Sequence, residues 1–384
     1  MNTRHLLLAP LFTLPTFLPF SAVAQSSMGF QTDAPHAVII DYDTQEVMFT
    51  KDATRPMPPA SMTKIMTAFM VFEALESGQI TLDTEFPVSE EAWRRGGAKS
   101  GSSTMFLDLN SQVSVEDLLR GVIIQSGNDA CIVLAEGLAG SESAFANRMT
   151  ARAEELGLTS ATFLNSTGWP DAGHEISALD LAKLAELMIR RFPQYYSLYS
   201  EESFTWNGIK QGNRNPLLNR FGGADGLKTG HTEVSGYGLV GSAEQDGERR
   251  IIVLNGTGSK SERRNTAITL MNAAFTQFKI YDVYKVDEVV GAIDVYMGKT
   301  AEVDLIAAKD VSVGLARISR SDLRTELHIK TAVAPVTKGT ELGDIIVYDG
   351  DKELKRIKVL AASDVAEKSA FGKAWSSLLG IIRG

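Results

Sequence analysis

The sequence predicts an α+β fold in which a large mixed domain precedes a small all-β domain. Three observations indicate this class. Strand patterns at residues 36–51 precede helical patterns, and strand patterns return from residue 203. Residues 280–362 then contain only short alternating segments, separated by turns at intervals of roughly ten residues. A chain of 384 residues, 44% of them hydrophobic, is long enough for two or three such units.

The first 24 residues have the pattern of a secretory signal peptide. A short basic start, MNTRH, precedes an apolar run of 15 residues, LLLAPLFTLPTFLPF, and the small residues AVA stand at the cleavage position. The run is too short and too rich in proline for a membrane span, although an uncleaved anchor remains an alternative. We therefore expect residues 1–24 to be removed and the protein to act on the periplasmic side of the inner membrane.

The mixed domain is expected over residues 25–279. HAVIIDYDTQEVMFTKD predicts two strands joined by a turn at 43–45. SMTKIMTAFMVFEALESGQ is apolar on nearly every side, which predicts a buried helix that stops near Gly78. Three more helices are predicted within 114–190. GYGLVGSAEQ and ERRIIVLNGT are expected to pair as strands, and a helix over 263–278 closes an antiparallel sheet flanked by helices and a helical lobe.

The all-β domain is expected over residues 280–362, and residues 363–384 are expected to form an amphipathic helix. His328 alternates with apolar neighbours, so we expect an ordinary outward-facing strand residue. The apolar side chains of the last segment fall on one helical face, and they are Phe371, Trp375, Leu378, Leu379 and Ile382. Such a helix can dock on the β domain, fray, or lie in a membrane interface. Its tryptophan and basic residues favour the surface of the inner membrane.

Composition narrows the classes of partner and cofactor. The net charge of −9 argues against nucleic acid as the main partner, because phosphate binding needs a basic face. Cys131 is the one cysteine and lies in the apolar helical run NDACIVLAEGLAG, so we expect a buried apolar side chain and no intramolecular disulfide. No group of residues has metal-ligand spacing or the context of a phosphate loop. We therefore expect neither a metal nor a cofactor.

The clearest chemical signal is PPASMTKIM at residues 58–66. The pattern S-x-x-K occurs by chance about once in a chain of this length, but here it opens a buried helix. Positions i and i+3 share a helical face, so the Lys64 amine can reach the Ser61 hydroxyl. To act as a base, Lys64 needs a pKa lowered from about 10.4 toward 7, a bias of roughly 4 to 5 kcal/mol. Burial and a second cation can supply that bias.

Two further motifs follow in chain order. They are S-G-N at Ser126, Gly127 and Asn128, and K-T-G at Lys228, Thr229 and Gly230. The second lies in a strand-like segment whose backbone can pair with an extended peptide, and Lys228 is the expected second cation. The three motifs together are far more specific than any one of them, and the set is typical of β-lactamases and penicillin-binding proteins.

These motifs make the chain similar to the D-alanyl-D-alanine carboxypeptidase family of low-molecular-mass penicillin-binding proteins. PASMTKIMT, EDLLRGVIIQSGNDA, NGIKQGNRNPLL and DGLKTGHT all resemble that family, and the likeness extends over the β domain and the tail. The resemblance implies a β-lactamase/transpeptidase-like catalytic fold. It also implies removal of the terminal D-alanine from peptidoglycan stem peptides through an acyl-enzyme, with β-lactam antibiotics as covalent inhibitors.

The resemblance also implies a role for each motif residue. Ser61 would be the acylated nucleophile and Lys64 its base. Ser126 would relay a proton to the leaving D-alanine. Asn128 would hold the substrate amide, and Lys228 would tune the electrostatics of the site.

Further roles concern the oxyanion and the substrate carboxylate. The backbone N–H groups of Ser61 and His231 would form the oxyanion hole, where such donors are often worth about 100-fold or more in rate. Thr229, Arg214 and Arg263 would bind the terminal carboxylate of the substrate. The alternative interpretation is that each arginine is an ordinary surface charge.

Three features stand apart from the motifs. His174 lies in the loop GWPDAGHEIS before a predicted helix, and we expect it to position that loop rather than to act in a Ser-His-Asp triad. Gln45 and Glu46 occupy a turn where a glycine would be usual. Trp169 stands where a smaller apolar residue is common. We expect the unusual residues Gln45, Glu46 and Trp169 to affect loop shape and substrate range more than chemistry.

Two other functions remain as alternatives. A class A-like β-lactamase is disfavoured by the extra β domain, by Gly127 in place of the usual aspartate, and by the lack of an obvious glutamate to activate a deacylating water. A catalytically quiet scaffold that binds the cell wall is disfavoured because such a protein has no need of the intact motif residues.

Overall fold

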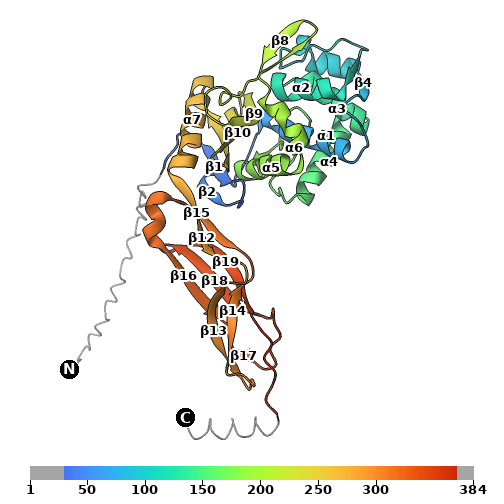
Figure 1. The fold of residues 1–384 in the computed structure, drawn as a ribbon. Coiled ribbons are helices and arrows are strands. Elements are labelled where there is room, and N and C mark those ends of the chain that lie inside the picture. Colours follow the sequence, from blue (N-terminus) through green and yellow to red (C-terminus); the bar gives the residue numbers. More distant parts are fainter. Residues whose placement is uncertain (1–29, 370–384) are drawn as a thin grey trace, which may run out of the picture.

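A five-stranded antiparallel sheet forms the centre of the N-terminal domain in the computed structural model, which describes residues 30–369 (Figure 1). The strand order is β2-β1-β11-β10-β9. The strands are β1 (His36–Asp41), β2 (Val47–Lys51), β9 (Ala224–Thr232), β10 (Gly236–Gln245) and β11 (Glu248–Thr257). The predicted pairs β1–β2 and β10–β11 both form. β9 is an edge strand, so within the described residues one side of its backbone has no strand partner.

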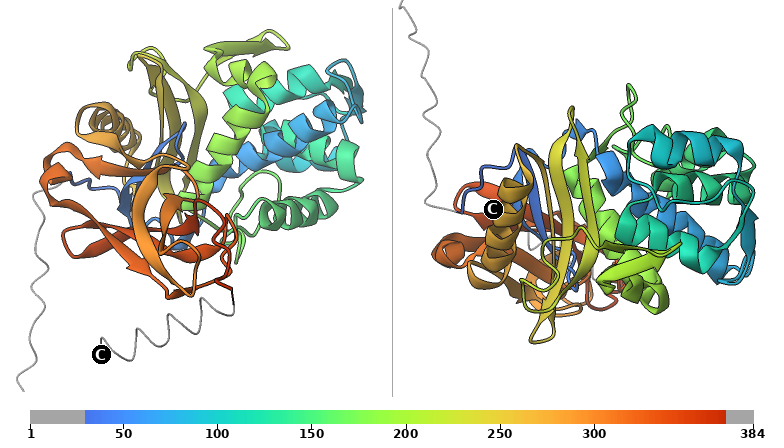
Figure 2. Two further views of the ribbon diagram at one scale, coloured as in Figure 1. Left: turned by 60° about the horizontal axis from the view of Figure 1, so that its bottom comes forward. Right: turned by 90° about the horizontal axis from the view of Figure 1, so that it is seen from above.

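Helices cover both faces of this sheet (Figure 2). α7 (Lys260–Thr276) packs on one face, where Ala37 and Ile39 of β1 point. Val38 and Ile40 point to the other face and pack against the helical lobe. This alternation follows the two-residue period of a strand, and it buries both faces.

The helical lobe is built around α1 (Lys64–Glu76), which is buried on nearly all sides as predicted. The other helices are α2 (Val115–Arg120), α3 (Asn128–Ala139), α4 (Glu142–Glu155), α5 (Ala178–Arg191) and α6 (Pro193–Tyr196). Gly78 follows the end of α1 with a φ of +72°, a conformation that favours glycine and agrees with the predicted stop.

Short elements complete this domain. The helical turns are η1 (Ala60–Thr63), η2 (Ala92–Gly96), η3 (Ala98–Ser100), η4 (Gly121–Gln125) and η5 (Ser197–Ser200). The short strand pairs are β3 (Pro56–Met57) with β6 (Ile176–Ser177), β4 (Glu85–Pro87) with β5 (Gln112–Ser114), and β7 (Ser203–Trp206) with β8 (Ile209–Gly212). The predicted helix VEDLLRGVIIQ changes to a π-helical turn at Gly121, where η4 continues α2.

The C-terminal domain is all-β, as predicted, and has its own apolar core. β12 (Phe278–Tyr284) pairs with β15 (Val311–Ala316), and η6 (Arg317–Asp322) follows. Six strands form the order β16-β18-β19-β14-β13-β17. They are β13 (Val289–Tyr296), β14 (Glu302–Ala307), β16 (Leu323–Ile329), β17 (Ala332–Val333), β18 (Glu341–Asp349) and β19 (Lys352–Ala361). His328 lies on β16 with an exposed side chain, as predicted.

Residues 363–369 continue the β domain and do not begin the predicted terminal helix. Val365 pairs with Val336, and Glu367 pairs with Gly298. The start of the predicted helix over 363–384 is therefore wrong, and residues 370–384 lie outside the described residues. Within residues 30–369, no helix is both long enough and apolar enough to cross a membrane.

The two domains meet where β2 packs on β15. A Cβ on Gly314 would lie 2.9 Å from the Met48 side chain, so glycine permits this close approach. Lys355 of β19 donates hydrogen bonds to Glu46 and, at 3.0 Å, to the Ser312 carbonyl. Gln45, with a φ of +61°, takes the conformation for which glycine would be usual. The turn that lacks a glycine therefore contributes a side chain to the domain junction.

Candidate active site

The turn that carries Ser61 is pressed between β9 and the loop at residues 165–170. Ser61 is partly exposed on η1, immediately before α1. A Cβ on Gly230 would lie 2.7 Å from the Pro59 carbonyl oxygen, and one on Gly168 would lie 1.8 Å from the Ala60 carbonyl oxygen. Only residues without a Cβ allow these approaches. The glycine of K-T-G is therefore a close-packing position against the serine turn.

The Lys64 side chain is buried, and its Nζ contacts three oxygen atoms. The distances are 3.1 Å to Ser61 Oγ, 2.7 Å to Asn128 Oδ1 and 2.6 Å to the Thr167 carbonyl oxygen. The pKa of Lys64 is lowered to about 8, chiefly by burial, and the charge of Arg214 contributes to this lowering. The S-x-x-K spacing thus brings the amine to the hydroxyl, with the expected direction of pKa change.

Ser126 and Asn128 reach the site from the end of η4 and the start of α3. Ser126 has a φ of +60°, and its buried hydroxyl has no hydrogen-bond partner among residues 30–369. Asn128 is fixed at both ends of its amide, because Oδ1 accepts from Lys64 and Nδ2 donates to Ser102 Oγ at 3.0 Å. A Cβ on Gly127 would lie 3.0 Å from the Met105 nitrogen, which explains a glycine between the two site residues.

Asp129 is a structural acid that no sequence motif predicts. Its buried carboxylate accepts from the Thr104 hydroxyl at 2.6 Å and from the N–H groups of Met105 and Leu107 at 2.8 and 3.1 Å. These bonds fix the segment that carries Ser102 against α3. The available signal was an acid inside an apolar helical run, but its partners lie far away in the chain.

Lys228, Thr229 and His231 lie along β9, the strand that packs on the serine turn. Lys228 is buried, and the hydrogen bond it donates among the described residues is a long one, 3.4 Å to the Thr229 carbonyl. Burial is the main cause that lowers the pKa of Lys228 well below its usual range, and the charges of Lys64 and Arg214 are the next largest causes. The motifs predict that Lys228 is the cation that lowers the pKa of Lys64. Here Arg214 has that effect, and Lys228 is itself disfavoured as a cation.

Arg214 and Arg263 approach Lys228 from two other elements. Arg214 follows β8, is exposed, and donates to the Ser103 hydroxyl. Arg263, in the first turn of α7, is buried, and burial lowers its pKa to about 10. Both arginine charges act on Lys228, so the three basic side chains form one cluster. Neither arginine is therefore an isolated surface charge.

An aromatic stack connects this cluster to the end of β9. The guanidinium of Arg263 lies 5.7 Å from the centroid of the Tyr237 ring. Tyr237 in turn stacks on His231, with 3.8 Å between ring centroids. The stack holds the His231 segment of β9 in place.

His174 and Cys131 occupy structural positions, as predicted. The His174 ring bridges Thr63 Oγ1, at 2.8 Å, and the Leu164 N–H, at 3.1 Å. Burial lowers its pKa to about 4, so the ring is neutral near neutral pH. Since Nδ1 accepts from Leu164, Nε2–H donates to Thr63. Cys131 is buried, and burial raises the pKa of its thiol to about 12.

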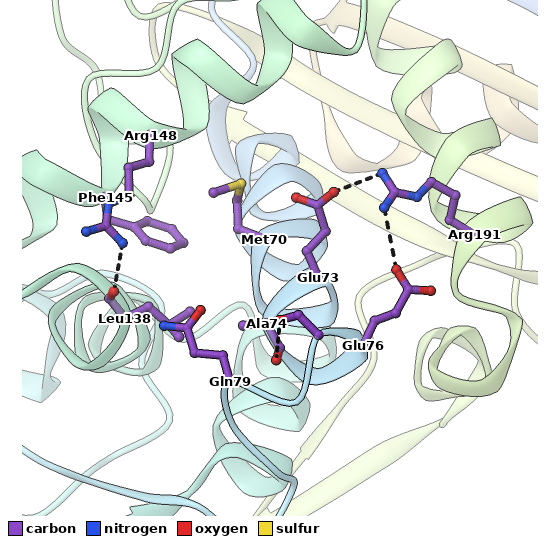
Figure 3. A pocket seen from close by; sticks show the side chains of 10 residues that line it. Met70, Glu73, Ala74, Glu76, Gln79, Leu138, Phe145, Arg148 and Arg191 are labelled. Carbon is purple, nitrogen blue, oxygen red and sulfur yellow. Dashed lines mark hydrogen bonds and ion pairs between the residues drawn. The ribbon is translucent and has the colours of Figure 1, made fainter.

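Two cavities differ in their relation to these residues. One of about 370 Å³ adjoins the serine turn and is lined by Pro59, Ala60, Thr232, Val234 and the loop at 168–175. It lies at the end of β9 beyond His231. The other, of about 400 Å³, lies among α1, α3, α4 and the end of α5, and none of the predicted site residues lines it (Figure 3). Within residues 30–369, no group of His, Cys, Asp and Glu side chains could hold a metal ion.

Comparisons with known proteins match both domains of the chain. A sequence profile described as D-alanyl-D-alanine carboxypeptidase matches residues 21–258, more than half of the chain. The chain belongs to the D-alanyl-D-alanine carboxypeptidase family. A second profile, described as the C-terminal domain of penicillin-binding protein 5, matches residues 278–367. The resemblance stated from the motifs is therefore confirmed for both domains.

Individual members of the carboxypeptidase family match along most of their length. The D-alanyl-D-alanine carboxypeptidase DacA of Haemophilus influenzae is 34% identical over 382 residues, which are 97% of each chain. A crystal structure of penicillin binding protein 5 from the same organism has a TM-score of 0.75 at 34% identity, and it covers 89% of this chain and 100% of that one. Penicillin-Binding Protein D2 from Listeria monocytogenes, in the ampicillin-bound form, has a TM-score of 0.56 at 28% identity and covers 65% and 100%.

The packing of Gly230 on the serine turn is open to test. We expect Gly230→Ala to slow labelling by a fluorescent penicillin by about 10- to 100-fold, because the new Cβ pushes β9 away from Pro59. Gly222→Ala is the matched control, since its Cβ would meet nothing closer than 3.7 Å. Equal labelling rates in the two variants would contradict a tight fit between β9 and η1.

Proposed function

We propose that this protein is a serine-type D-Ala-D-Ala carboxypeptidase that removes the terminal D-alanine of peptidoglycan stem peptides through an acyl-enzyme on Ser61. The observation that carries the proposal is the set of oxygen atoms around Lys64 Nζ. A neutral amine has two N–H groups and one lone pair. The amide oxygen of Asn128 and the carbonyl oxygen of Thr167 can only accept, so they take the two N–H groups.

The lone pair of Lys64 then faces the remaining partner, the Ser61 hydroxyl at 3.1 Å. A hydroxyl can donate as well as accept, so the arrangement suits removal of the Ser61 proton as the oxygen attacks the scissile carbonyl. The new Ser61–carbonyl bond gives a tetrahedral oxyanion, which the N–H groups of Ser61 and His231 stabilise. The leaving D-alanine takes its proton from Lys64 through Ser126, whose buried hydroxyl has no partner among the described residues. Water then attacks the ester carbonyl, Lys64 takes a proton from the water and returns it to Ser61 Oγ, and the shortened peptide leaves.

The cluster of basic side chains formed by Lys228, Arg214 and Arg263 is the proposed site for the terminal carboxylate of the substrate. Lys228 has one long hydrogen bond in the free protein and lies close to Arg214 and Arg263. An incoming carboxylate supplies the missing acceptor and negative charge, and the Thr229 hydroxyl can add a further bond. The stem peptide then runs along the edge strand β9, past His231, toward the cavity at Thr232 and Val234.

A β-lactam places a carboxylate and a strained amide in the same relation, so we propose that penicillins acylate Ser61. The related D2 protein, whose structure holds ampicillin, supports this extension. Rapid hydrolysis of the resulting acyl-enzyme is not expected. Glu142 is the glutamate whose charge acts on Lys64 and is the candidate activator of water, but Ser166 and Arg95 occupy its two oxygens.

One experiment separates the carboxypeptidase from the two alternatives. Purified protein is incubated with fluorescent penicillin and, separately, with a D-Ala-D-Ala peptide, and free D-alanine is assayed. We expect long-lived labelling and D-alanine release, and Ser61→Ala to abolish both, because the nucleophile is lost. Ser77→Ala, at the far end of α1, is the control. Rapid penicillin turnover without D-alanine would indicate a β-lactamase, and neither activity would indicate a scaffold.

The pKa of Lys64 predicts how acylation depends on pH. The protonated amine cannot accept the Ser61 proton, so the rate constant for penicillin acylation should fall about tenfold per pH unit below a pKa of about 8 and level off above it. His174 does not contribute to this limb, because its pKa is about 4. A rate independent of pH between about 6 and 9 would exclude Lys64 as the titrating base.

We further propose that the protein is exported by its signal sequence and is held at the periplasmic face of the inner membrane by its last segment. The amphipathic pattern of residues 371–382 supports this arrangement. So does the position of β17, which lies at the end of the β domain remote from α1 (Figure 1), because Val336 follows β17 and pairs with Val365 near the end of the described residues.

A truncation tests the anchor. A variant that ends at Ser369 keeps the pairings of Val365 and Glu367, so we expect normal penicillin labelling but a shift from the membrane fraction to the soluble periplasmic fraction. Fractionation followed by labelling measures both properties in one gel. If the truncated protein stays with the membrane, the terminal segment is not the anchor.

A further inference from the structure

The Thr167 carbonyl is the partner of Lys64 that no sequence motif supplies. It belongs to the loop at 165–170, and its position depends on the preceding residue, Ser166, which is fully buried. The Ser166 N–H and hydroxyl both donate to Glu142 Oε1, at 3.1 and 2.8 Å. The Ser166 carbonyl accepts from Thr67 Oγ1 at 2.6 Å. Ser166 is therefore held from both sides, by α4 through Glu142 and by α1 through Thr67.

Glu142 is itself held in a defined position. It is the first residue of α4, where the helix dipole favours a negative charge. Its side chain is 10% exposed, and Oε2 accepts from Arg95 at 3.2 Å. Arg95 also pairs with Glu91 and lies 5.6 Å from the Trp169 ring centroid, on the same loop as Thr167. Both oxygens of the carboxylate thus bind groups that shape this loop.

We propose that Glu142 is a positioning residue for acylation: through Ser166 it keeps the Thr167 carbonyl on Lys64 Nζ, so that the lone pair of the amine stays directed at Ser61. This role rests on the proposed function of Lys64 as the base. If the loop loosens, Nζ loses an acceptor and can turn its N–H toward Ser61 instead, which is the unproductive orientation.

Glu142 also has an electrostatic effect on the same amine. Its charge raises the pKa of Lys64, against the lowering by burial and by Arg214. The other charged or titratable groups that act on Lys64 or on which it acts are Asp129 and Cys131 of α3, Lys228 of β9, and His174 of the loop. Removing the Glu142 charge alone should therefore lower the Lys64 pKa and leave those groups in place.

Two substitutions separate the positioning effect from the charge. Glu142→Gln keeps an oxygen acceptor for Ser166 and removes the charge. We expect it to retain the plateau rate constant for penicillin acylation within about threefold, with the rising limb of the pH profile moved to lower pH. Glu142→Ala leaves two buried donors of Ser166 unpaired and frees the loop. We expect a loss of about 10- to 100-fold at every pH.

The control is Glu154→Gln, the same chemical change at an exposed position of the same helix, which should leave rate and profile unchanged. Circular dichroism and thermal unfolding establish that each variant is folded. If Glu142→Ala does not fold, Glu142→Asp takes its place, because it keeps the charge and draws the carboxylate back from Ser166; we expect it to lose acylation rate at every pH. The proposal is overturned if a folded Glu142→Ala or Glu142→Asp is acylated as fast as the parent, or if Glu142→Gln loses as much rate as Glu142→Ala. Absence of Ser61 labelling in the parent protein would instead overturn the proposed function.

Discussion

The burial of one amine, that of Lys64, is the constraint on which the rest of the site depends. Lowering its pKa from 10.5 to about 8 corresponds to about 3 kcal/mol that the surroundings must supply. Much of this comes from excluding water, so the turn of Ser61, the loop of Thr167 and the start of α3 have to close over a polar atom. The same three segments provide the oxygen partners that make burial tolerable.

This enclosure explains the small residues around the site better than a chemical role would. Gly230 lets β9 lie against Pro59, Gly168 lets the loop lie against Ala60, and Gly127 leaves room for Met105. Two nearby acids then hold the neighbouring segments in place by hydrogen bonds. Asp129 holds the segment of Ser102 with several hydrogen bonds, and Glu142 holds Ser166 with two. The glycines permit close packing and the buried carboxylates hold the loops by hydrogen bonds, so together they make the site rigid although loops form much of it.

The sequence predicts those parts of the protein whose cause is local. The buried helix after Ser61, the two strand pairs and the reach of Lys64 to Ser61 follow from periodicity and helical spacing. β19 escapes prediction because charged residues interrupt KELKRIKVLA, and its burial depends on β14 and β18. Thr167 and Glu142 escape for a related reason. A backbone carbonyl has no residue signature, and a glutamate at a helix start is common, so their roles exist only in the tertiary fold.

Which of Lys64 and Lys228 is charged also depends on the tertiary fold. Motif spacing favours Lys228 as a permanent cation beside a neutral Lys64, yet burial disfavours the charge on Lys228 in the free protein. The two views agree if binding of the substrate determines which of the two lysines is charged. An anion bound between Lys228, Arg214 and Arg263 stabilises the Lys228 cation, and that cation in turn disfavours a second charge on Lys64. Binding of the carboxylate would then prepare the base, which couples recognition of a free C-terminus to acylation of Ser61. An internal peptide lacks that anion, so the same electrostatics would also restrict the reaction to chain ends.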